Sequence, residues 1–132
     1  MLHQDGITVP LSEMIGKIFI KVVSDRESVS FFLPDGSYYC LEHEQNCCES
    51  VNLEDVGGDL SDLEGKPILD FREETNRREP QSSDHESYTW TFYIISTIKG
   101  TVTLRFYGHS NGYYSEKVDL FYFGPDDGED IN

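Results

Sequence analysis

Residues 87–116 read SYTWTFYIISTIKGTVTLRFYGHSNGYYSE, and this stretch decides the fold. Two runs within it, Tyr88–Thr97 and Thr101–Tyr107, are rich in Thr, Val, Ile and aromatic residues, which favour a half-buried pleated strand. Between the runs, Gly100 follows Lys99, and a glycine can supply the positive φ of a tight turn. The stretch therefore predicts a β-hairpin.

Side chains on a strand alternate between its two faces, so each predicted strand has two distinct sides. One face of the first strand carries three rings and one aliphatic side chain: Tyr88, Trp90, Phe92 and Ile94. The face of the second strand that carries its basic residue holds Thr101, Thr103, Arg105 and Tyr107. A polar and aromatic face of this kind is either an ordinary solvent-facing sheet surface or a platform for a ligand.

A nucleotide is the ligand that these residue types suit best. Aromatic rings stack on bases, and the planar guanidinium of Arg105 matches a phosphate group. Directly after the second strand, the Asn111-Gly112 pair predicts a turn, whose backbone amides can also form an anion-binding nest. We therefore expect a small electropositive recess formed by a guanidinium and several rings.

Length and charge limit the classes of protein that the chain can represent. With 132 residues it is expected to be a single domain, residues 1–132. Ten basic and 25 acidic residues give a formal net charge of -15, which argues against nonspecific binding to nucleic acid or to anionic membranes. The same charge favours an alternative function, an acidic DNA mimic that inhibits a host defence protein or nuclease. The chain has no apolar run of membrane-spanning length and no signal-peptide pattern, so an intracellular location is expected.

The remaining patterns predict an α+β, β-rich fold: an antiparallel sheet of about six strands with one or two short helices. Outside the hairpin, alternating or β-branched segments predict strands at Lys17–Val23, Ser28–Leu33, Tyr38–Glu42, Pro67–Glu74 and Lys117–Phe123. Short helices are expected at residues 11–16 and at 60–64, the second capped by Asp59. The segments without a hydrophobic period are expected to be a loose arm at 1–10, a mobile loop at 75–86 and an acidic tail at 124–132.

Three cysteines, Cys40, Cys47 and Cys48, are the other chemically distinctive group. An odd count with an adjacent pair is untypical of a disulfide framework, so reduced thiols are expected. Together with His43 they include zinc-ligand types, but their spacing matches no finger or knuckle. Buried packing, metal binding and a catalytic Cys-His pair all remain open, with packing favoured. No catalytic motif stands out, so we expect no enzymatic activity, no metal and no cofactor.

Several blocks of the chain together resemble a family of small acidic bacteriophage proteins. They are YxxEHEQNCCESV at 39–51, GDLxDLxGxPIL at 58–69, SYTWTFY at 87–93, TIKGxVTxRxYG at 97–108 and SNGYYSE at 110–116. The resemblance covers roughly residues 16–120. It connects the chain to the first type of Thoeris anti-defence protein.

This resemblance implies a signal-sequestering protein, or sponge, that works in the host bacterial cytoplasm. Such proteins are homo-oligomers that hold a cyclic ADP-ribose isomer, made by a bacterial TIR-domain enzyme, at subunit interfaces and do not cleave it; some members also hold cyclic oligonucleotides. On chemistry alone, the residues that suit such a ligand are Arg105, Lys99, Asn111, Tyr113, Tyr114, Trp90 and Phe92. Neither nucleic acid nor a membrane is expected as a partner.

Overall fold

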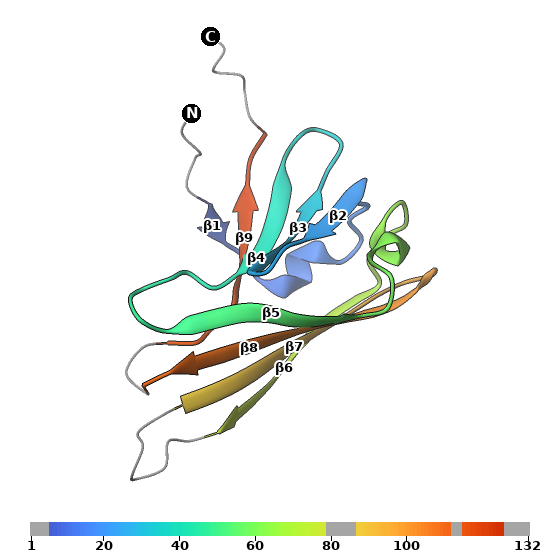
Figure 1. Cartoon of the computed structure of the whole chain (residues 1–132). Helices are drawn as coiled ribbons and strands as arrows, with labels where there is room; N and C mark the ends of the chain where they lie inside the picture. Colours follow the sequence, from blue (N-terminus) through green and yellow to red (C-terminus); the bar gives the residue numbers. More distant parts are fainter. Residues whose placement is uncertain (1–5, 79–86, 112–114, 126–132) are drawn as a thin grey trace.

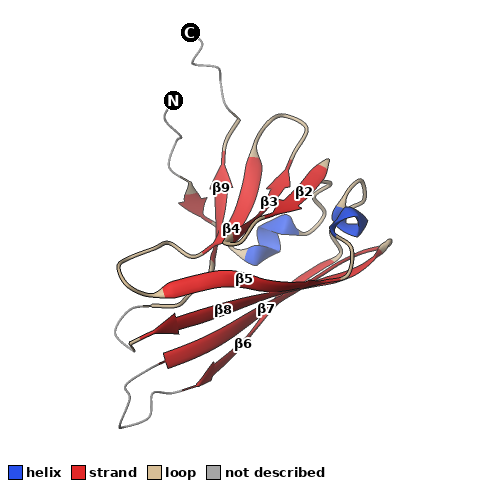
Figure 2. Cartoon of the chain, in the orientation of Figure 1, coloured by secondary structure: helices blue, strands red, loops and turns tan. Residues whose placement is uncertain are grey.

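The computed structural model describes residues 6–78, 87–111 and 115–125 (Figure 1). These residues form nine strands, two short 3-10 helices and two antiparallel sheets packed face to face (Figure 2). The predicted β-rich, antiparallel, single-domain fold is therefore confirmed. The strands are more numerous than the six expected and are divided between two sheets. Both helices have four residues, so neither is a candidate membrane span.

The first sheet has the strand order β1-β9-β4-β3-β2. Its strands are β1 (Ile7–Thr8), β2 (Lys21–Ser24), β3 (Ser28–Phe32), β4 (Tyr38–Glu42) and β9 (Asp119–Phe123). The second sheet has the order β5-β8-β7-β6. Its strands are β5 (Ser50–Gly57), β6 (Asp70–Arg78), β7 (Ser87–Thr97) and β8 (Gly100–Ser110). The helices are η1 (Leu11–Met14) and η2 (Leu60–Leu63), and Asp59 caps η2 by accepting the Ser61 N–H at 3.0 Å, as predicted.

The hydrophobic core lies between the inner faces of the two sheets. Side chains that are at most 2% exposed come from both sheets and from the segments around η1 and η2, and they include Phe19, Phe31, Tyr39, Leu63, Tyr93, Leu104 and Phe106. Burial alternates residue by residue along β7 and β8, so the hydrophobic period seen in the sequence is the one that the fold uses. The faces of β7 and β8 that point away from this core are half-buried and form a surface.

The hairpin turn is tighter than predicted. Thr97 pairs directly with Gly100, so Ile98 and Lys99 alone form the loop. Gly100 belongs to β8 and is not among the described glycines with positive φ. Glycine is needed there because there is no room for a side chain: a Cβ would lie 2.7 Å from the Asp62 carboxylate. The glycine therefore allows η2 to pack against the hairpin.

The acidic segment after Ser50, for which no strand was predicted, is the edge strand β5. Val51 is buried and Leu53 is half-buried, but the pairing with β8 shifts between Leu53 and Asp55. A β-bulge of this kind inserts an extra residue and interrupts the two-residue period. The alternation resumes at Val56, so a simple period search does not recognise the strand.

Two of the three segments expected to lie outside regular structure contain strand residues. The expected arm at residues 1–10 includes β1, which pairs with β9. The expected loop at residues 75–86 begins within β6, since residues 75–78 continue that strand, and its remainder lies outside the described residues. Of the expected tail at 124–132, residues 126–132 also lie outside the described residues.

The chain passes between the sheets twice. Residues 43–49 lead from β4 to β5, and residues 111–118 lead from β8 to β9 (Figure 1). We call Ser115–Val118, the described final part of the second passage, the strap. The two passages are joined directly, because the His43 imidazole Nδ1 lies 2.6 Å from the carbonyl oxygen of Lys117.

Candidate functional site: the outer face of the four-stranded sheet

A row of aromatic rings crosses the outer face of the four-stranded sheet. The antiparallel register places Trp90 opposite Tyr107 and Tyr88 opposite His109. Ring centroids are 5.1 Å apart for Trp90 and Tyr107, 5.1 Å for Tyr88 and His109, and 6.4 Å for Tyr88 and Tyr107. All four side chains are half-buried, so each ring has one side supported by the sheet and its neighbours. We call these four residues the ring row.

Arg105 and Phe92 continue this face toward the hairpin turn. They are directly opposite each other, one alternation beyond the Trp90 and Tyr107 pair. The Arg105 Nε donates to the Glu54 carboxylate at 2.8 Å, and these side chains are 40% and 42% exposed. Glu54 reaches this position because it stands at the bulge of β5. The guanidinium therefore lies beside the rings with an anionic partner already in place.

A second guanidinium lies on the far edge of the same sheet. Arg72 of β6 is opposite Ile94, and its Nε donates to Asp70 at 2.7 Å. Glu74 is 3.7 Å from the same guanidinium. The Arg72–Asp70 and Arg105–Glu54 pairs are both substantially exposed. Solvent and salt therefore screen them, and each carboxylate holds its arginine weakly. An incoming phosphate would compete with exposed carboxylates rather than with a buried ion pair.

The structure brings together three of the seven predicted ligand residues. Trp90, Phe92 and Arg105 share the outer face. Lys99 lies at the hairpin turn, where its Nζ donates to the carbonyl oxygens of Ser61 and Glu64 at 3.0 and 3.1 Å and so holds η2. Asn111 follows the opposite end of β8, about 40 Å from Lys99 along the strand at a rise of about 3.3 Å per residue. Tyr113 and Tyr114 lie outside the described residues.

Lys99 and Asn111 therefore do not share a site within one chain, because they lie at opposite ends of β8 and a single small ligand bound to that chain cannot reach both. Sequence reasoning placed Tyr88 and Tyr107 on these faces but did not include them, or His109, among the ligand residues. The signal was available, since a two-residue turn fixes which residues of β7 and β8 are opposite each other. The prediction instead gave the turn three residues and left the register undetermined.

Of the cavities found among the described residues, the two most prominent do not lie at the rings. Two cavities, of about 240 and 250 Å³, flank the strap instead. The first is lined by Glu73, Thr75, Thr89, Thr91 and the strap, and the second by His43, Glu44, Gln45, Asn46, Asp119 and two strap residues. Within the described part of the chain, neither cavity is lined by a predicted ligand residue.

The strap is fixed to the hairpin by a buried carboxylate. Glu116 is 7% exposed and accepts hydrogen bonds from hydroxyls of both hairpin strands: Thr89 at 2.6 Å, Ser87 at 3.4 Å, and Ser110. Gly108 makes the approach possible, because a Cβ there would lie 2.8 Å from the Glu116 Cβ. These contacts position the strap and satisfy a buried charge, which would otherwise be costly.

The loop at residues 43–49 is held by a buried ion pair, His43 with Glu49. The Nε2 of His43 is 2.5 Å from the Glu49 carboxylate, and the two side chains are 5% and 0% exposed. Both ring nitrogens lie within hydrogen-bond distance of oxygen atoms, Nδ1 of the Lys117 carbonyl and Nε2 of the Glu49 carboxylate, so the ring connects the two groups. The hydrogen bond from His43, with further bonds from the backbone N–H groups of Cys47 and Asn46, lowers the pKa of Glu49 to about 2.

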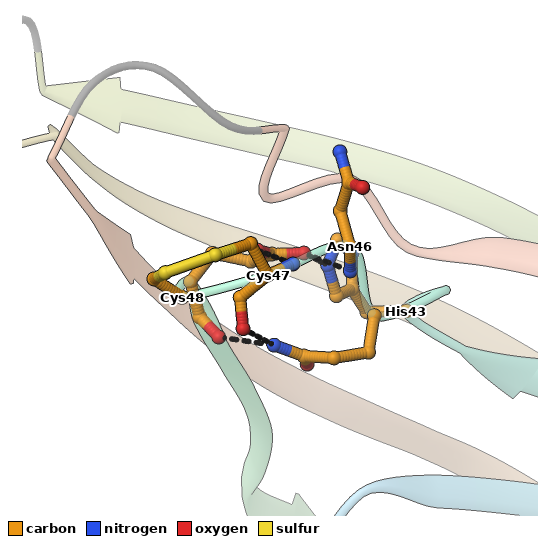
Figure 3. The surroundings of a disulfide bond; sticks show 6 residues. His43, Asn46, Cys47 and Cys48 are labelled. Atoms are coloured by element: carbon orange, nitrogen blue, oxygen red, sulfur yellow. Dashed lines mark hydrogen bonds and ion pairs between the residues drawn. A yellow bond between two sulfur atoms is a disulfide. The ribbon is translucent and has the colours of Figure 1, made fainter.

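The cysteines take two different states. Cys47 and Cys48 are joined in a disulfide between adjacent residues (Figure 3), so the expectation of reduced thiols throughout was wrong. Cys40 is a buried free thiol, as the packing interpretation predicted, but that interpretation was wrong for Cys47 and Cys48, which are exposed. Burial raises the pKa of Cys40 to about 11. A thiol with such a pKa is a poor nucleophile at neutral pH. His43 contacts Glu49 and a carbonyl oxygen, and the described residues contain no cluster of three metal-ligand side chains.

The fold and the ring row define a class: a small β-sandwich with an aromatic outer face flanked by guanidinium–carboxylate pairs. Comparison with family models places the chain more closely. Residues 12–120 match the family described as Domain of unknown function (DUF7448), and the chain belongs to that family. No curated protein and no solved structure matches it significantly.

Proposed function

We propose that this chain is a binding protein of phage origin that captures a small cyclic nucleotide and holds it without cleaving it. The observation that carries the proposal is the ring row with Arg105 beside it. A base can stack on a half-buried ring, and a phosphate can pair with the neighbouring guanidinium. The resemblance to Thoeris anti-defence proteins supports a cyclic ADP-ribose isomer as the ligand, with cyclic oligonucleotides as further candidates.

Electrostatics set two requirements for this function. The ligand is anionic and the chain carries a net charge of -15, so long-range attraction does not assist binding. At physiological salt, charges beyond about 8 Å are largely screened, so the local guanidinium matters more than the distant carboxylates. The phosphate must also replace Glu54 as the partner of Arg105. Enclosure between subunits of a homo-oligomer would lower the local dielectric and strengthen these contacts, and we include such an oligomer in the proposal.

The test is a thermal-shift screen of the purified chain against cyclic ADP-ribose isomers and cyclic di- and trinucleotides. A true ligand at 100 times its Kd should stabilise the protein by about 2.7 kcal/mol. The bound material is then released by heating and its mass measured. Intact nucleotide supports sequestration, whereas a cleaved product would show a hydrolase. Light scattering with and without ligand reports the oligomeric state.

The net charge itself favours the competing function, inhibition of a basic protein by DNA mimicry. That function requires carboxylates spaced like phosphates on a free surface, and it predicts salt-sensitive binding to a host nuclease or defence protein. It also predicts indifference to every nucleotide in the screen. A substitution at Trp90 separates the two functions, because stacking matters only for nucleotide capture.

A further inference from the structure

We propose that Cys47 and Cys48 form a redox-reversible modification site, a dithiol–disulfide pair that controls how residues 43–49 are held against the strap. Its reaction partners are low-molecular-weight thiols and protein dithiols. The pair lies in one of the two passages between the sheets (Figure 3), four residues after His43, whose ring contacts the Lys117 carbonyl of the other passage.

Position and exposure favour a reversible role over a structural one. A disulfide stabilises a fold mainly by closing a loop in the unfolded chain, and adjacent residues enclose no intervening chain. Both cysteines are exposed, so a thiolate can reach either sulfur. Exposed disulfides are generally the labile ones, whereas structural disulfides resist reduction.

Direct hydrogen bonds connect the pair to the buried ion pair. The Cys47 N–H donates to one Glu49 carboxylate oxygen at 2.9 Å, and the Asn46 N–H donates to the other at 2.7 Å. The Gln45 amide donates to the carbonyl oxygens of Cys47 and Glu49 at 3.2 and 2.7 Å. The ring that the disulfide closes restricts the backbone at residues 47 and 48, so it fixes where the Cys47 N–H points.

The connection continues to the strap through His43. Its ring contacts both the Glu49 carboxylate and the Lys117 carbonyl. Glu116, which precedes Lys117, accepts a hydrogen bond from Thr89 of β7. Thr89 lies in sequence between Tyr88 and Trp90, two members of the ring row. Opening the disulfide frees the backbone at one end of this series of contacts. Reduction should therefore loosen residues 43–49 and their attachment to the strap.

The chemistry is balanced as thiol–disulfide exchange. A thiolate attacks one sulfur of the pair, the other sulfur leaves as a thiolate, and a second thiol resolves the mixed disulfide. The pair gains two electrons and two protons, and the two reducing thiols become one disulfide. Oxidation by a disulfide of the same class reverses the reaction.

The experiment compares the full chain after equilibration with reduced and with oxidised glutathione. Thiols are alkylated after denaturation and counted by mass. Oxidised protein should react at Cys40 alone, and reduced protein at all three cysteines. Hydrogen exchange is then measured in both states. The amides of Asn46 and Cys47 should exchange about fivefold faster after reduction, as expected for loss of about one hydrogen bond, with a smaller increase in the strap.

Two variants control for indirect effects. A Cys47→Ser, Cys48→Ser double variant should exchange like the reduced protein under both conditions, while Cys40→Ser should keep the full difference. Three reactive thiols under both conditions would overturn the proposal. So would a disulfide that forms and breaks while exchange at residues 43–49 stays unchanged. None of these readouts uses a nucleotide, so the result is independent of the proposed function.

Discussion

The two outer faces of the molecule both carry rings in cross-strand register, yet their chemistry differs. On the five-stranded sheet, Phe32, Tyr38 and Phe123 are in register on neighbouring strands, with centroids 5.1 and 4.8 Å apart. Gly6 packs against the last of these rings, since a Cβ there would lie 2.6 Å from it. On the four-stranded sheet, the ring row is followed toward the hairpin turn by Arg105 and then, on the far edge strand opposite Ile94, by Arg72, each with an exposed carboxylate partner.

The comparison shows that aromatic density alone does not define a site. Rings stacked on each other and covered by backbone bury area and stabilise the sheet. Rings beside weakly held guanidinium groups can instead accept a base and a phosphate together. Four tests, in order of decreasing expected effect, can break or sharpen this distinction.

The largest difference should appear when one ring is removed from each face. Trp90→Ala should weaken nucleotide binding about 5- to 150-fold, because stacking on an aromatic side chain contributes about 1–3 kcal/mol per base. Tyr38→Ala should leave binding unchanged and lower the free energy of unfolding by about 1–3 kcal/mol, less than the loss for a fully buried ring. Calorimetric titration and urea unfolding measure the two effects. Equal loss of binding in both variants would place the ligand elsewhere.

The second test uses pH to probe the His43–Glu49 pair, which lies in the loop between the two sheets. The pKa of Glu49 is about 2 in the folded protein, below the usual value of 4.5 for a glutamate side chain. A carboxyl group with a lowered folded pKa contributes stability that is full above the unfolded pKa and is lost as the pH falls toward the folded one. The free energy of unfolding should therefore decrease as the pH is lowered from about 5 to about 2. Urea unfolding across this range should show a smaller change in Glu49→Gln, and an unchanged profile would contradict the ion pair.

Gly108→Ala tests the other passage. The new methyl group would lie 2.8 Å from the Glu116 Cβ and 3.3 Å from the Val51 side chain, so the strap or β5 must move. Overpacking of this kind costs typically about 1–3 kcal/mol. Gly36→Ala provides no matched control, because Gly36 has a φ of 93° and any side chain there is strained. Gly57→Ala does, since its nearest atom is 3.7 Å away and it lies on β5, the edge strand that pairs with the strand of Gly108. A Gly108 variant as stable as the Gly57 variant would show that the strap is held loosely.

The sequence predicted the fold well where propensity and period agree. Burial along β7 and β8 follows the two-residue alternation through Thr97 and from Thr101 onward, so both strands were found from pattern alone. β5 was missed because the bulge at Glu54 breaks the period in an acidic segment. Local patterns contain no information on an irregularity that depends on the partner strand.

The candidate site was only partly predictable, for a related reason. Trp90, Phe92 and Arg105 alternate on neighbouring strands, so periodicity could bring them together. Lys99 is close to them in sequence, but its ammonium group donates to the carbonyl oxygens of Ser61 and Glu64. These residues precede Lys99 by 38 and 35 positions, so no local pattern indicates the contacts. Arg105 and Glu54 are 51 positions apart, and no local signal connects them.

The smallest expected effect comes from removing the carboxylate that occupies Arg105. The Arg105–Glu54 pair is exposed, and such pairs contribute about 0–1 kcal/mol, so Glu54→Gln should change the free energy of unfolding by less than about 1 kcal/mol. For the same reason, a phosphate that replaces Glu54 in the wild type loses at most that amount, and the variant should bind the nucleotide up to about fivefold more tightly. Asp70→Asn is the matched control, because it removes a similarly exposed partner from Arg72 at the other edge of the sheet. Tighter binding in the Glu54 variant alone would place the phosphate at Arg105, and tighter binding in the Asp70 variant alone would place it at Arg72. If neither variant changes affinity while Trp90→Ala weakens binding, the rings hold the base and neither carboxylate competes measurably with the phosphate.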